Sequence, residues 1–150
     1  MSRAIVLFLL LSVHMFTANA EDGPCVAEAK PLMTLKTPWT EISKAAVALP
    51  ADCFDGYFGE GISDTIVRKV IRDWSGFLKE LTKHSSSDDK FFLLVLKSLN
   101  STLNPDDIES FSKLAQESCP RNLTSQCDAI LNQARKSLAD YDAPVSSGKP

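Results

Sequence analysis

The sequence predicts an all-α fold, a compact bundle of about five or six helices with two disulfides. Apolar residues recur at three- and four-residue steps along most of the chain, which is the period of an amphipathic helix. No stretch alternates between apolar and polar residues for long enough to form a sheet. Four cysteines follow an apolar leader, and an even count in an exported chain indicates disulfides.

Residues 1–20 have the organisation of a secretory signal peptide. Arg3 gives a basic start, residues 4–11 form an apolar run, and Ala18 and Ala20 are small residues where a signal peptidase reads them. A membrane anchor is the alternative, but this run is far short of the roughly 20 residues that a span needs. We expect cleavage after Ala20, export to the periplasm or the extracellular space, and no integral membrane segment thereafter.

The remaining chain has the composition of one globular domain. The full sequence, leader included, is 44% hydrophobic and 23% charged and has a formal net charge of −3. This charge gives no basic footprint for nucleic acid, so we expect no nucleic-acid partner. We expect a single helical domain over residues 21–142 and a flexible C-terminal tail over 143–150.

The cysteines allow three pairings. We favour Cys25–Cys53 and Cys119–Cys127, because each bridge joins neighbouring segments of the chain. No two cysteines have the C-x-x-C spacing, so we expect neither a redox motif nor a zinc site.

Proline marks the boundaries of the first helices. Residues 25–36 are apolar but interrupted by Pro31, which predicts a kinked or two-piece helix. Thr37 followed by Pro38 predicts a cap and a proline at the first helical position. The apolar spacing from Trp39 onward then predicts the second helix.

The strongest amphipathic pattern in the chain runs from Ile66 to Leu81, and Ser63 is placed to cap this helix. Gly76 lies inside the pattern, where it would allow close packing by a neighbour. The segment 52–61 holds three glycines, and it predicts a short helical turn and a loop.

Three further helices follow. Residues 90–99 are apolar on most sides, which predicts a central helix. Asn104 is a good capping residue and Pro105 suits the first position of the next helix. The last helix is expected to begin at Asn122 or Thr124.

No arrangement of side chains points to catalysis, so we expect no catalytic residue, no metal and no cofactor. The domain has one histidine, His84, which fits a cation near a helix C-terminus. The acidic pairs 88–89 and 106–107 stand at predicted helix starts, where compensation of the helix dipole explains them. We therefore expect that the protein is not an enzyme.

The glycine-rich segment is the best candidate for a binding surface. It combines large aromatic side chains with acids, namely Phe54, Asp55, Tyr57, Phe58 and Glu60. The alternative is that these rings only cap the core beside a Cys25–Cys53 bridge. The acid spacing does not match a calcium loop, and the glycine order does not match a phosphate-binding loop.

Two sequons, at Asn100 and Asn122, lie in predicted inter-helix segments and would be glycosylated in a eukaryotic source. The sequence slightly favours a bacterial periplasm, where they would be chance matches.

Taken together, the sequence favours an exported protein of inhibitor, immunity or adaptor type that binds another exported protein. The acidic balance suits a basic partner, because opposite charge steers its approach. The alternative is a carrier of a small apolar ligand within the helical bundle.

Overall fold

Helices account for the regular structure throughout the described part of the chain. The computed structural model describes residues 24–84, 86 and 88–143, so the predicted signal peptide and tail residues 144–150 lie outside it. Over these ranges the chain forms seven α-helices and two short 3₁₀ helices, with no strand. In chain order they are α1 (Pro24–Leu32), α2 (Trp39–Ala48), η1 (Ala51–Phe54), α3 (Gly56–Arg72), α4 (Trp74–Leu81), α5 (Lys90–Ser98), α6 (Pro105–Glu117), η2 (Arg121–Leu123) and α7 (Thr124–Asp142).

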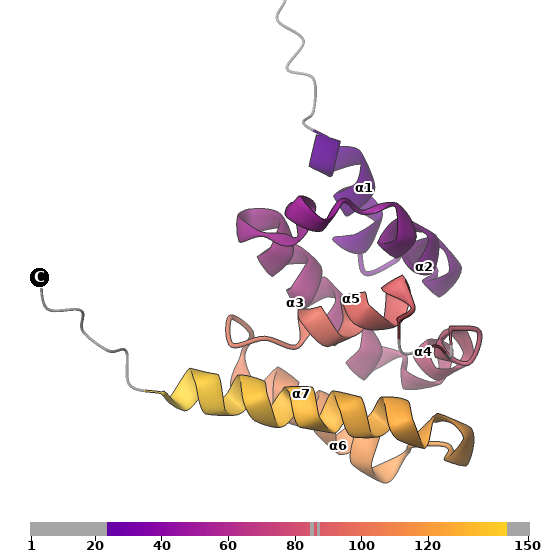
Figure 1. Ribbon diagram of the computed structural model, residues 1–150, viewed down its shortest axis with the longest axis vertical. Helices are drawn as coiled ribbons and strands as arrows, with labels where there is room; N and C mark the ends of the chain where they lie inside the picture. Colours follow the sequence, from indigo (N-terminus) through magenta and orange to yellow (C-terminus); the bar gives the residue numbers. More distant parts are fainter. Residues whose placement is uncertain (1–23, 85, 87, 144–150) are drawn as a thin grey trace, which may run out of the picture.

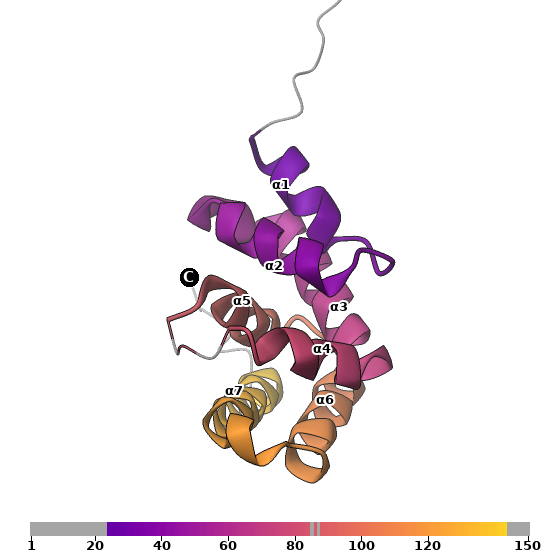
Figure 2. The ribbon, with the colours of Figure 1, turned by 90° about the vertical axis from the view of Figure 1, so that its right-hand side faces the viewer.

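The helices are arranged in three tiers along the long axis of the molecule (Figures 1 and 2). Helices α1 and α2 pack together at one end, and α6 and α7 form an antiparallel pair at the other. Helices α3 and α5 lie between them and contact both ends, which places α5 centrally, as its apolar sequence predicts. The all-α fold predicted from the sequence is therefore confirmed.

Five aromatic side chains fill the centre of this arrangement. Phe77 lies in the middle, with ring centroids 5.6 Å from Trp39, 5.4 Å from Trp74, 6.3 Å from Phe91 and 6.1 Å from Phe111. The side chain of Phe77 is completely buried. These five rings come from four helices, so this ring cluster joins α2, α4, α5 and α6 through one contact centre, with Trp74 at its edge.

The long amphipathic helix expected over 66–81 is divided at Asp73. Its backbone leaves the helical region there (φ −138°, ψ 60°), and its carboxylate accepts a hydrogen bond from the Gly76 amide at 3.0 Å. The other carboxylate oxygen accepts from Trp39 Nε1 at 2.9 Å. Asp73 thus begins α4 and anchors α2 at the same point. A periodic pattern of apolar residues cannot reveal such a break, because both helices keep the same buried face.

Gly76 has a different role from the one expected. A Cβ at this position would collide with the Asp73 carboxylate, so glycine makes room for the cap of α4 and not for a neighbouring helix.

The prediction that the preceding helix begins near Ser63 is also wrong. Helix α3 begins at Gly56, after Asp55, and Ser63 lies buried within it. The Ser63 hydroxyl donates to the Gly59 carbonyl one turn earlier (2.7 Å). Three glycines within the first six residues of α3 lower the helix propensity of this segment, which is why the sequence indicates a loop there.

Other helix starts agree with the sequence. Asn104 caps α6 by accepting from the Asp106 amide at 3.0 Å, with Pro105 at the first helical position. Thr37, by contrast, does not cap α2, because Pro38 takes the capping position without a side-chain hydrogen bond. Helix α7 begins at Thr124, the second of the two starts considered.

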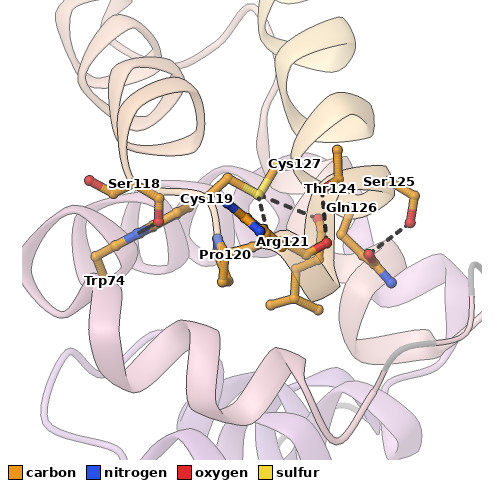
Figure 3. Close-up of a disulfide and its surroundings, with 10 residues drawn as sticks. Trp74, Ser118, Cys119, Pro120, Arg121, Thr124, Ser125, Gln126 and Cys127 are labelled. Carbon is orange, nitrogen blue, oxygen red and sulfur yellow. Dashed lines mark hydrogen bonds between the residues drawn. A yellow bond between two sulfur atoms is a disulfide. The ribbon is translucent and has the colours of Figure 1, made fainter.

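Both predicted disulfides are present. Cys25–Cys53 joins α1 to η1 with a Cα–Cα distance of 5.2 Å, and Cys119–Cys127 joins the end of α6 to α7 at 6.3 Å. Figure 3 shows the second bridge next to Ser118, whose carbonyl accepts a hydrogen bond from Trp74 Nε1 (3.2 Å). This bridge therefore holds the α6–α7 connection against the edge of the ring cluster. Among the helices of the described ranges, none combines the length and the apolar character that crossing a membrane requires.

Candidate functional site

The five residues predicted to bind a partner lie together at the junction of η1 and α3, which we call the aromatic turn (residues 54–60). The Cys25–Cys53 bridge fixes the start of this turn to α1. Asp55 accepts from the Gly56 amide at 2.8 Å, and Gly56 takes a positive φ of 51°, which a glycine adopts without strain. The turn is thus tied to α1 at its start and bends at Gly56.

Close packing inside the turn depends on Gly59. A Cβ at this position would lie 2.9 Å from the Phe54 carbonyl oxygen, which is closer than real Cβ contacts. Glycine therefore lets η1 fold back onto the first turn of α3.

The rings of the aromatic turn divide between core and surface. Phe54 and Phe58 are partly buried and pack against the core. Tyr57 is 76% exposed, the largest value among the exposed large apolar side chains of the described residues, and its ring meets Phe58 edge-on at 5.7 Å. The alternative that all three rings only cap the core therefore holds for Phe54 and Phe58 but not for Tyr57.

The acids of the turn face water. Asp55 and Glu60 are both exposed, and no cationic group of the described residues lies within 4 Å of either carboxylate. They line a hollow of about 270 Å³ together with residues 100–102. The exposed face of the turn therefore combines one phenol ring with two unpaired negative charges.

Asn100, the first sequon, is tied into the wall of this hollow. Its amide nitrogen donates to Ser63 Oγ at 3.0 Å and to the Lys97 carbonyl at 3.1 Å, and its Oδ1 accepts from Thr102 Oγ1 at 2.6 Å. Asn122, the second sequon, is exposed in η2. The two sequons therefore differ: the side-chain amide of Asn100 is hydrogen-bonded to the protein, whereas Asn122 is exposed to solvent.

A second concave surface, which the sequence did not indicate, lies between α2 and α5. We call it the α2–α5 groove; its volume is about 340 Å³. It is lined by the end of α2, the following segment and one face of α5, namely Ala46–Ala51, Phe54, Lys90, Leu93, Leu94 and Lys97. Val47 is 52% exposed and Leu93 is 40% exposed. The sequence of α5, which is apolar on most sides and has a lysine near each end, could have indicated this groove. The same pattern is equally typical of a buried helix whose lysines lie in water.

A buried polar cluster, also missed, connects α2, α4 and the start of α5. Glu80 is buried; its Oε1 accepts from Ser43 Oγ at 2.8 Å and its Oε2 lies 2.7 Å from Lys83 Nζ. The His84 ring stands between two carboxylates, with Nε2 3.4 Å from Glu80 Oε1 and Nδ1 2.9 Å from Asp89 Oδ2. We call these residues the Glu80 cluster. His84 therefore lies just beyond the end of α4, and its two ring nitrogens contact carboxylates.

The pKa values of the two carboxyl groups in this cluster, Glu80 and Asp89, are both lowered. Burial by itself raises the pKa of Glu80, but the hydrogen bonds from Lys83, Ser43 and His84 outweigh it and hold that pKa below its ordinary value. Burial likewise raises the pKa of Asp89, but bonds from His84 and from the Phe92 and Phe91 amides lower it overall. Both carboxylates are thus stabilised in the charged form. Asp89 also caps α5, which agrees with its predicted place at a helix start.

No set of three or more His, Cys, Asp or Glu side chains in the described part of the chain could hold a metal ion. Comparisons with protein-family models, with curated proteins and with solved structures gave no match for this chain.

Proposed function

We propose that this protein is exported and acts by binding another protein, as an inhibitor, an immunity protein or an adaptor. Two disulfides support export, because such bonds persist in oxidising compartments. The observation that carries the proposal is the exposure of Tyr57 on a turn fixed by a disulfide and a glycine-dependent fold. Tyrosine is enriched at the energetic centres of protein interfaces, and a rigid anchor loses little entropy on binding.

The partner presents a basic surface to the aromatic turn. Asp55 and Glu60 flank the exposed ring, and neither is neutralised by a cation of the described residues. Opposite charge around an aromatic anchor accelerates association and rejects acidic competitors. The chemistry of the turn therefore favours a cationic exported protein, such as a secreted toxin or hydrolase.

A native mass spectrum of the protein isolated gently from its own source tests this proposal. The proposal predicts a second protein that co-isolates in a fixed ratio and dissociates on denaturation. If the protein instead carries only a small molecule that leaves on denaturation, it is a carrier.

A carrier of a small apolar ligand is the second candidate function. The α2–α5 groove favours it, because the groove exposes Val47 and Leu93 in a concave surface. The ring cluster fills the interior of the bundle, so the groove at the surface is a better place for a ligand than that interior.

A further inference from the structure

We propose that the α2–α5 groove is a binding site for a small amphiphilic anion, of the class of a medium-chain carboxylate. This site is separate from the exposed face of the aromatic turn, and the inference goes beyond the proposed binding of a protein partner.

Most of the side chains that line the groove are apolar. Ala46 and Leu94 are buried beneath it, while Val47 on α2 and Leu93 on α5 line it and keep about half of their surface in water. Phe54 closes one end. An alkyl chain in this groove would remove apolar surface of both helices from water, which favours binding.

The rim of the groove carries two positive charges. Lys90 and Lys97 stand two helical turns apart on α5, about 10 Å along its axis, with the leucines of the groove between them. Lys90 Nζ donates to the Val47 carbonyl at 3.1 Å, which holds one ammonium at the end of α2. No carboxylate of the described residues lies within 4 Å of either ammonium.

This charge pattern selects the ligand. An anionic headgroup at the rim would complete the unused hydrogen bonds of the lysines, and charge-assisted bonds are about twice as strong as neutral ones. A cationic amphiphile would meet the same apolar walls but would be repelled at the rim. A volume of about 340 Å³ is at the lower end of small-molecule sites, which indicates one short chain.

Titration of the oxidised protein with decanoate, followed by amide NMR, tests the site. We expect saturable shifts confined to residues 46–51, 54 and 90–97. Decyltrimethylammonium, whose alkyl chain is one carbon longer and whose charge is opposite, is expected to bind at least about fivefold more weakly. Equal affinity for the two amphiphiles, shifts centred elsewhere, or no saturation with decanoate would overturn the proposal.

Two variants and one control locate the ligand. Leu93→Ser should weaken decanoate about tenfold by removing apolar contact, and Lys97→Gln about three- to fivefold by removing one charge. Both side chains are exposed, so the folded state should persist, which circular dichroism verifies. Lys136→Gln, an exposed lysine on α7, should leave decanoate affinity unchanged. If Lys97→Gln weakens binding no more than Lys136→Gln, the anion does not sit at this rim.

Discussion

Aromatic side chains gather at two places in this molecule, and the two differ in what surrounds them. In the ring cluster, Phe77 is met by four other rings and has no contact with water. In the aromatic turn, Tyr57 meets one ring and is 76% exposed. The first group is enclosed because several helices converge on it. The second lies on a single turn at the edge of the fold.

The buried ring cluster is expected to determine the stability of the fold, and the exposed ring of Tyr57 is expected to determine partner binding. A buried ring contributes its full apolar area and its ring contacts to the folded state. An exposed ring contributes almost nothing to folding, so its removal should leave stability nearly unchanged and can change only what the ring binds. Substitutions in the ring cluster should therefore change the free energy of unfolding, whereas substitutions in the aromatic turn should change the affinity for a partner.

The largest effect on stability is expected from Phe77→Ala. Removal of this ring leaves a cavity between α2, α4, α5 and α6, which should cost about 3–5 kcal/mol in the free energy of unfolding. Urea denaturation measured by tryptophan fluorescence gives this value directly. A loss below about 1 kcal/mol would mean that the ring cluster is not the centre of the core.

The disulfides come next. In the chain-entropy model, Cys25→Ser with Cys53→Ser should cost about 3.5 kcal/mol, and Cys119→Ser with Cys127→Ser about 2.5 kcal/mol, because the first bridge closes the longer loop. Only the first pair of substitutions should also accelerate hydrogen exchange in the aromatic turn. Faster exchange there in both variants would show that the Cys25–Cys53 bridge does not specifically hold the turn.

The Glu80 cluster gives a smaller, pH-dependent effect. The pKa of Glu80 is lower in the folded protein than its ordinary value of 4.5, so the stabilisation is complete above about pH 4.5 and is lost as the pH falls through the folded pKa. Asp89 behaves likewise from its ordinary value of 3.8. Glu80→Gln should cost about 1–2 kcal/mol at pH 7 and reduce the loss of stability in acid. Stability measured from pH 7 to pH 3 for both proteins checks this, and parallel curves would contradict it.

The smallest change in stability is expected from Tyr57→Ala. Its side chain is mostly in water and makes one ring contact, so the free energy of unfolding should change by less than about 0.5 kcal/mol. Urea denaturation beside the Phe77→Ala variant measures the contrast. A loss of more than 2 kcal/mol would place Tyr57 in the core and remove the distinction between the two regions.

Much of this fold could be predicted from the sequence, because its signals are local. Proline and asparagine at 104–105 define a helix start, and cysteine spacing favours the observed bridges. The division at Asp73 could not be predicted, since the carboxylate acts through a tertiary bond to Trp39 on another helix. The Glu80 cluster and the α2–α5 groove were hidden for the same reason: each is assembled from helices distant in sequence.

The arrangement of the candidate site could be predicted only in part. Aromatic and glycine residues in one short segment were a local signal, and all five predicted residues lie together. Which ring faces water was not predictable, because that depends on how η1 folds back at Gly59.

The most direct test of the central claim is the affinity of the co-isolated partner for three proteins, measured by titration calorimetry. The proteins are the unaltered chain, Tyr57→Ala and Tyr141→Ala; the last removes another exposed tyrosine, 54% exposed and at the far end of α7. If the aromatic turn is the binding surface, Tyr57→Ala weakens binding by at least about tenfold, as loss of an anchor residue does, while Tyr141→Ala leaves it unchanged. Equal affinities for all three proteins would contradict the account.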